Sequence, residues 1–155
     1  MDRVDLPRVV LFTAAAVALA AARPASASEE EEHHNHAAVF VGATAAHGTG
    51  AATVGADYEY RLSGRIGVVA LADFAFFDHV TTLVGAGAVV HPIAALKIIA
   101  APGGEFADGE SAFAVRVGAA YDVHVGAGSI TPTYNADVSD GHVAHVFGIA
   151  FGYGF

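Results

Sequence analysis

The chain ends with VAHVFGIAFGYGF, residues Val143 to Phe155, and this stretch decides the fold. Counting back from the end in steps of two gives a bulky apolar set: Phe155, Tyr153, Phe151, Ile149 and Phe147. The residues between them are Gly154, Gly152, Ala150, Gly148 and Val146. Side chains of a β-strand alternate between two faces, so one face here is apolar and the other carries very little. The pattern predicts a strand that lies between lipid and a crowded interior.

The first 27 residues have the pattern of a secretory signal peptide. Arg3 and Arg8 make the start basic, and the run from Val9 to Ala22 is apolar and uncharged. Ala25-Ser26-Ala27 then supplies the small residues of a cleavage site. The apolar run has about 14 residues, whereas a spanning helix needs about 20. We therefore expect residues 1–27 to be removed on export, rather than to stay as a membrane anchor.

The rest of the chain divides into a short polar leader and one domain. Residues 28–36 (SEEEEHHNH) show no periodicity, and we expect them to be flexible; residues 37–155 form the domain. After residue 27 only four basic side chains remain: Arg61, Arg65, Lys97 and Arg116. This acidic chain has no basic footprint for nucleic acid. It also has no cysteine, so an exported protein of this sequence does without disulfides.

Composition then selects the architecture. Hydrophobic residues make up 54% of the chain, yet after residue 27 no continuous apolar run could form a transmembrane helix. The 18 glycines also disfavour long helices. Because a membrane admits only helices or closed barrels, we predict an all-β, eight-stranded antiparallel transmembrane barrel. The expected strands are Ala37–Ala46, Ala52–Leu62, Ile66–Phe76, Leu83–His91, Leu96–Gly103, Ala112–His124, Ile130–Ala136 and Val143–Phe155.

The connections alternate in character. Tight turns are expected at residues 63–65, 91–94 and 126–129. The other connections are expected at residues 48–51, 78–82, 104–111 and 137–142, with Gly104–Ser111 the longest. An even number of strands places both termini on the periplasmic side, with the longer loops outside.

Charged residues alternate with apolar ones along several strands. A basic side chain on the lipid face costs ~2–4 kcal/mol at mid-depth, so the charged set is expected to point into the lumen. This predicted lumen network consists of Asp57, Glu59, Arg61, Asp73, Lys97, Arg116, Asp122 and Asp137. It has two interpretations: an ion-selective constriction, or a plug of paired charges that fills a barrel barely wide enough for side chains.

At this point the chain resembles the small eight-stranded outer-membrane β-barrel proteins of Gram-negative bacteria, a porin-like and largely uncharacterised family. The resemblance rests on the signal peptide, Gly55–Leu62 (GADYEYRL), Leu96–Gly103 (LKIIAAPG) and Phe147–Phe155 (FGIAFGYGF). It implies residence in the outer membrane among lipid and lipopolysaccharide. It also implies recognition by the barrel-assembly machinery of the terminal aromatic residues Phe151, Tyr153 and Phe155.

The expected function is a structural or interaction role, or a narrow channel, in a monomer without cofactor or catalysis. Metal binding by His33, His34 and His36 is a further hypothesis, since imidazoles beside carboxylates suit Zn²⁺, Cu²⁺ or Ni²⁺. A solvated polar leader is the simpler interpretation of the same residues.

Two alternatives belong to other classes of protein. The candidate catalytic residues of a lipid-modifying enzyme lie near the last outer connection: Ser139, Asp140, His142 and His145. A nucleophile must touch its base, however, and proximity in sequence does not show this. A soluble periplasmic lipocalin-like barrel would place the apolar faces inside instead.

Overall fold

The computed structural model describes residues 34–126 and 128–155. The predicted signal peptide and most of the predicted leader lie outside the described residues. No helix in the described part is long and apolar enough to cross a membrane. The described chain forms nine β-strands: β1 (Asn35–Ala46), β2 (Thr49–Ser63), β3 (Ile66–Phe76), β4 (Val80–Ile93), β5 (Leu96–Ala107), β6 (Glu110–Tyr121), β7 (Val123–Val125), β8 (Gly128–Ser139) and β9 (His142–Gly154).

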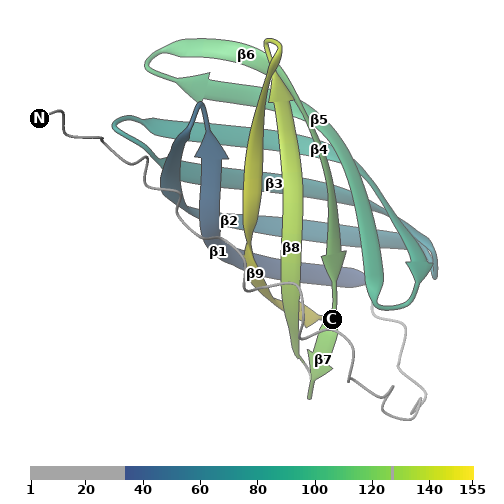
Figure 1. The fold of residues 1–155 in the computed structure, drawn as a ribbon. Helices are drawn as coiled ribbons and strands as arrows, with labels where there is room; N and C mark the ends of the chain where they lie inside the picture. Colours follow the sequence, from purple (N-terminus) through teal and green to yellow (C-terminus); the bar gives the residue numbers. More distant parts are fainter. Residues whose placement is uncertain (1–33, 127) are drawn as a thin grey trace, which may run out of the picture. The chain divides into compact units, whose positions relative to one another are not determined.

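These strands form one antiparallel sheet that closes on itself (Figure 1). β6 and β7 are two parts of one stave, because both pair with β8 in a single register on either side of Asp122. The barrel therefore has eight staves, and the predicted fold class is confirmed. Closure comes from β1 and β9, which pair from His36 opposite Gly154 to Ala45 opposite His145.

The interruption at Asp122 follows from its neighbours. In the common register of β6 and β7 it lies opposite Thr131 of β8, while the preceding Tyr121 lies opposite Pro132, and proline has no backbone N–H to donate. The Asp122 backbone N–H donates to the carbonyl oxygen of Ala95 at 2.7 Å. Asp122 is thereby anchored to the β4–β5 turn while its side chain faces inward.

The turns at the end opposite the termini are shorter than we expected. The loop predicted over Gly104–Ser111 is wrong: β5 continues to Ala107 and β6 starts at Glu110. The connection predicted over 137–142 is likewise reduced to two residues, and those over 48–51 and 78–82 become residues 47–48 and 77–79. The strands carry their pairing past the apolar band, so polar residues near their ends do not mark loops.

Three of these turns share one chemistry. His47-Gly48, Asp108-Gly109 and Asp140-Gly141 all have positive φ at both residues, from 45° to 79°. That backbone matches the type I′ turn, whose twist fits the twist of the two strands it joins. Glycine is favoured at its second position because a side chain there would be strained.

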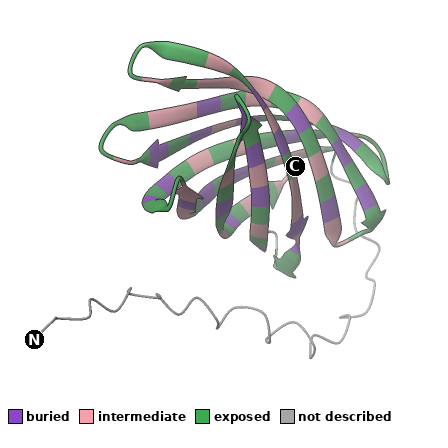
Figure 2. Cartoon of the chain, turned by 45° about the horizontal axis from the view of Figure 1, so that its top comes forward, coloured by how far each residue is buried: buried purple, intermediate pink, exposed green. Residues whose placement is uncertain are grey.

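Buried and exposed residues alternate along the strands (Figure 2). The outward set includes many large apolar side chains, whereas the inward set includes the buried charged residues. On β9, Phe147, Ile149, Phe151 and Tyr153 face outward, with 37% to 55% of their surface exposed. A soluble lipocalin-like barrel has the reverse arrangement.

The small residues of β9 serve the closing seam. Gly42 of β1 pairs with Gly148 of β9, and the inward ring of Phe40 lies against both. A Cβ at either glycine would meet that ring and the opposite backbone. The small residues that alternate along β9 are therefore required by packing on its inner face, where the backbones of β1 and β9 approach closely.

The barrel starts slightly earlier than predicted. β1 begins at Asn35, so Asn35 and His36, expected in the flexible leader, belong to the first stave. Asn35 exchanges both backbone hydrogen bonds with Phe155 at 3.2 and 2.9 Å, which brings the two ends of the described barrel together.

Candidate functional site

The first group of buried charges surrounds Lys97. Its Nζ lies 3.3 Å from Glu59 Oε2 and 3.1 Å from Asp122 Oδ2. Glu59 Oε1 accepts from His91 Nε2 at 2.6 Å and lies 3.3 Å from Arg61 Nε. Thr131 completes the group by donating its hydroxyl to Asp122 Oδ1 at 2.7 Å. We call these six residues the Lys97 cluster.

The Lys97 cluster joins staves on opposite sides of the lumen. Lys97 comes from β5 and Glu59 from β2, three staves apart in the sheet. The side chains of Glu59, His91 and Asp122 are at most 2% exposed, and that of Lys97 is 7% exposed. Buried charges need partners, and this cluster gives both acids more than one.

The second group is the Arg116 cluster, formed by Asp73, Arg116 and Asp137. Arg116 Nε and Nη2 donate to the two oxygens of Asp137, both at 2.7 Å. Its Nη1 donates to Asp73 Oδ2 on β3, again three staves away across the lumen. This two-pronged contact matches the planar guanidinium to the carboxylate and fixes its orientation.

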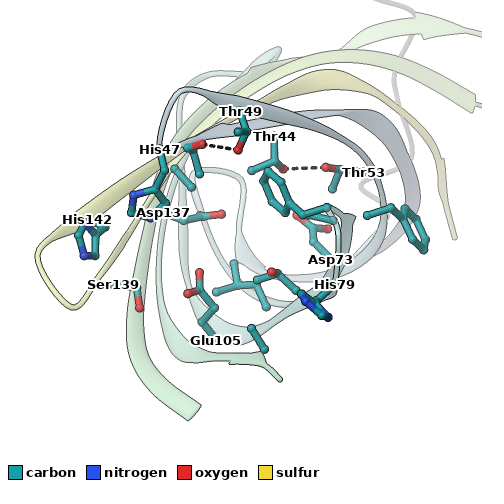
Figure 3. Close-up of a pocket in the computed structure, with 18 of the residues that line it drawn as sticks. Thr44, His47, Thr49, Thr53, Asp73, His79, Glu105, Asp137, Ser139 and His142 are labelled. Carbon is teal, nitrogen blue, oxygen red and sulfur yellow. Dashed lines mark hydrogen bonds between the residues drawn. The ribbon is translucent and has the colours of Figure 1, made fainter. Parts of the chain in front are cut away.

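A cavity of about 780 Å³ opens above the Arg116 cluster (Figure 3). Its floor is the Arg116 cluster, and its rim is formed by the turns at the end opposite the termini. The buried hydroxyls of Thr44 and Thr53 bond to each other on its wall at 2.6 Å. We call this cavity the vestibule.

A second cavity, of about 50 Å³, lies between the two clusters. Lys97 and Arg116 both line it, together with Asp57, His36 and Asn135. Asp57 forms no hydrogen bond or ion pair within 4 Å with any described residue. His36 Nδ1 and Asn135 Oδ1 are buried there without a hydrogen-bond partner. The cavity has these polar groups on its wall and is large enough for ordered water.

All eight charged residues of the predicted lumen network face inward, seven from strands and Asp122 from the break between β6 and β7. Seven of them form the two clusters, with Asp57 beside the inner cavity. The predicted network did not include two members of the Lys97 cluster, Thr131 and His91, and His91 was placed only at the end of a strand. The signal for His91 was its even spacing from the buried residues Leu83 and Val89 of β4, which places all three on one face of the strand.

The histidines proposed as metal ligands diverge. His33 lies outside the described residues. His34 is exposed and stacks on the outward Tyr60, with ring centroids 6.3 Å apart, whereas His36 points inward and bonds Ser129 Oγ at 3.2 Å. Over residues 34–126 and 128–155, no group of three or more potential ligands could hold a metal ion. Binding through all three histidines stays a prediction.

The residues proposed for an enzyme do not form a joined set in the described chain. Ser139 and His142 face each other across the Asp140-Gly141 turn and both line the vestibule, but no hydrogen bond joins their side chains. His145 lies on the outer surface, where its Nδ1 is 2.7 Å from the Tyr134 hydroxyl. The geometry lacks the nucleophile–base contact that acyl transfer requires.

No protein-family model matches the sequence, and no curated protein matches it either. Solved structures do. Ail, an outer-membrane protein of Yersinia pestis, matches with a TM-score of 0.59 and 15% identity over 80% of this chain and 99% of that one. The chain has the fold of a small outer-membrane β-barrel.

Two further structures share this fold. The N-terminal barrel of OprF from Pseudomonas aeruginosa matches with a TM-score of 0.55 and 12% identity, over 80% of this chain and 100% of that one. A designed transmembrane β-barrel matches with a TM-score of 0.55 and 16% identity, over 76% and 94% of the two chains. At such identities the small outer-membrane barrel is common to these proteins as a fold, so activity has to be argued from the residues of this chain.

Proposed function

We propose that this protein is a monomeric outer-membrane barrel, closed by its own buried charges, with a structural or interaction role. The observation that carries the proposal is the pair of clusters that bridge the lumen. Arg116 links β6 to β3, and Lys97 links β5 to β2. An eight-stranded interior is barely wider than its side chains, so two such bridges leave no continuous opening.

Location in a membrane is supported by the outward apolar faces and by the strand lengths. Apart from the short β7, each strand has 11 to 15 residues, against about 9–11 for a tilted strand that crosses the hydrocarbon core. In outer-membrane barrels with an even number of strands both termini face the periplasm. In that orientation the vestibule of this protein, at the end opposite the termini, opens to the exterior. Export through the predicted signal peptide belongs to the same proposal.

Conductance separates the plug from a narrow channel. Purified, refolded protein is inserted into planar bilayers, with insertion checked by heat-modifiable migration on gels. We expect no conductance steps from the unaltered protein, because both bridges are intact. Steps in the unaltered protein whose cation preference falls in Glu59→Gln would refute the plug and support an ion-selective channel.

Assembly through the C-terminal strand is the second part of the proposal. Phe151 and Tyr153 face outward, and the rings of Tyr153 and Phe155 stack 6.3 Å apart, so these aromatic side chains are accessible from outside the barrel, which supports their recognition by the assembly machinery. Replacing Phe155 with Ala is expected to lower the amount of heat-modifiable protein in the outer-membrane fraction. Phe106→Ala, which removes an outward aromatic from β5, is the control. Equal loss in both variants would argue against a special role for the terminus.

A further inference from the structure

The histidines at the end opposite the termini take no part in the plug. Among the described residues, His47, His79 and His142 lie at or beside the turns there and line the mouth of the vestibule. His79 has an acidic partner, since its Nδ1 lies 3.0 Å from Asp108 Oδ1. His47 and His142 instead contact each other, with ring centroids 4.5 Å apart and ring planes at 64° (Figure 3). We call these two residues the histidine pair.

The histidine pair lies across the seam between the first and the last stave. His47 begins the two-residue turn that follows β1, and His142 is the first residue of β9. Continued past its last pair, Ala45 opposite His145, the register of the seam brings Gly48 opposite His142 and leaves His47 one residue away. Both rings belong to exposed residues, so they can turn about their side-chain bonds and are accessible to solutes.

The turn that carries His47 differs from two turns of the same kind. All three have positive φ at both residues, but the first residue is Asp108 or Asp140 in the other two and His47, with φ 52°, in this one. Asn, Asp and Gly are preferred at that position of a type I′ turn, because they tolerate positive φ best. Histidine at this position therefore calls for a reason outside the turn, and the contact with His142 offers one.

The separation of the two rings fits a pair of imidazoles bound to one metal ion. An imidazole nitrogen lies about 2.0–2.1 Å from such an ion, which puts the ion roughly 3.2 Å from the centre of the ring. Two rings bound at a right angle then have centroids roughly 4.5 Å apart, and two bound at a tetrahedral angle roughly 5.2 Å apart. The observed 4.5 Å matches the right angle, which is typical of square-planar and tetragonal sites for Ni²⁺ or Cu²⁺.

We propose that the histidine pair is a binding site for a divalent transition-metal ion of the Ni²⁺ and Cu²⁺ class. One nitrogen of each ring occupies a corner of the coordination sphere, and water occupies the others. Within the described residues no group of three or more potential ligands could hold an ion, so this site is open, unlike a closed structural centre with four protein ligands.

The bound ion links the two ends of the barrel. His47 follows the first stave and His142 begins the last, so the ion closes a loop that contains most of the chain between them. Cross-links that close long loops are expected to stabilise a fold the most, because they remove the most chain entropy from the unfolded state. We therefore expect the ion to stabilise the folded barrel at its seam.

The test is calorimetric titration with Ni²⁺ of the refolded full barrel in detergent at neutral pH. His33→Ala and His34→Ala are present together in every sample, because they remove candidate ligands of the leader. We expect saturable binding of one Ni²⁺ per chain, and weaker binding of Zn²⁺, which favours a tetrahedral site. Denaturant unfolding is expected to shift to a higher midpoint with Ni²⁺, since an ion that binds only the folded barrel stabilises it.

His47→Asn removes one imidazole and keeps a residue that suits positive φ. We expect at least about tenfold weaker Ni²⁺ binding, because even the loss of an outer partner of a metal ligand costs 10–100-fold. The shift of the unfolding midpoint by Ni²⁺ is expected to disappear in the same variant. His79→Asn is the matched control: it makes the same change at the mouth of the vestibule, on the histidine that lies against Asp108, and is expected to leave the affinity unchanged.

Heat-modifiable migration confirms that each variant is folded. The proposal fails if Ni²⁺ binding does not saturate, or if His47→Asn and His79→Asn weaken it equally, which would show general attraction to the histidines of the barrel mouth. One Ni²⁺ per two chains would show a bridge between copies and would also overturn it. The same holds if Ni²⁺ leaves the unfolding midpoint unchanged, or if Zn²⁺ binds more tightly than Ni²⁺.

Discussion

The Lys97 cluster and the Arg116 cluster use similar chemistry at two depths of one lumen, but their surroundings differ. Glu59, His91 and Asp122 line neither cavity, and Lys97 touches only the inner cavity of about 50 Å³. All three members of the Arg116 cluster line the vestibule of about 780 Å³. Vestibule water can therefore hydrate the Arg116 cluster when it is broken, whereas the Lys97 cluster meets only the small inner cavity, through Lys97 and Thr131. The difference separates a sealed bridge, the Lys97 cluster, from one that faces the open vestibule.

The sealed cluster is expected to show the largest effect. Lys97→Ala leaves Glu59 and Asp122 without the charge between them, which we expect to lower the free energy of unfolding by ~3–5 kcal/mol. Denaturant unfolding of the refolded protein, followed by circular dichroism, measures it. The control is Arg65→Ala, an exposed turn residue, expected within ~0.5 kcal/mol of the unaltered protein. Equal losses in the two variants would contradict a sealed bridge.

Arg116→Ala is the matching change in the open cluster. It removes the partner of two carboxylates, but vestibule water reaches both, so we expect a smaller loss of ~2–3 kcal/mol. The same unfolding measurement applies. A loss as large as that of Lys97→Ala would show that the vestibule does not hydrate its floor.

A glycine substitution at the β1–β9 seam tests how tightly the wall beside the inner cavity is packed. Gly148→Ala pushes a methyl group toward the Phe40 ring, which lines that cavity, and we expect a loss of ~2 kcal/mol from overpacking. Gly50→Ala is the control, because its nearest neighbour is the Thr44 carbonyl at 3.9 Å. If both variants unfold alike, the close approach at the seam carries no energetic weight.

Substitutions of two threonines, one in the Lys97 cluster and one on the vestibule wall, are expected to have the smallest effects on the free energy of unfolding. Thr131→Val removes a hydrogen bond to the Asp122 carboxylate in the sealed cluster, at an expected cost of ~1.5 kcal/mol. Thr44→Val removes a bond between neutral hydroxyls on the vestibule wall, and ~0.5–1 kcal/mol is expected. A reversed order in the unfolding data would break the distinction between sealed and open halves.

Much of the fold could be predicted because the two faces of a membrane strand are so unlike. Ile66–Phe76 was predicted with its observed bounds, and the eight-stave count follows from the same alternation. The long loop expected over Gly104–Ser111 failed for a physical reason. Glu105 lies inside the barrel mouth and Glu110 begins a strand, so polar character there marks the water-filled end of a barrel rather than a loop. The dipeptide Asp108-Gly109 is typical of a two-residue hairpin turn and predicts the turn that is observed.

The site was harder to predict, because contacts across the lumen depend on distances around the barrel. Alternation places Arg116 and Asp73 inward, but only the closed sheet shows that β6 and β3 face each other. The position of His36 on the first strand was not predicted, because a polar segment precedes it and β1 starts before the apolar residues of that strand. The vestibule itself is an absence of side chains, which no single stretch of sequence encodes.

The seam between β1 and β9 has a consequence for how the barrel is made. The other staves pair with their neighbours in the chain, so hairpins can form early and locally. The seam alone joins the two ends of the barrel. Its formation closes the longest loop of chain, so it has the largest entropy cost of loop closure. We therefore expect the seam to form last, because it needs both ends of the barrel. The glycines at Gly42 and Gly148 sit where that final encounter takes place.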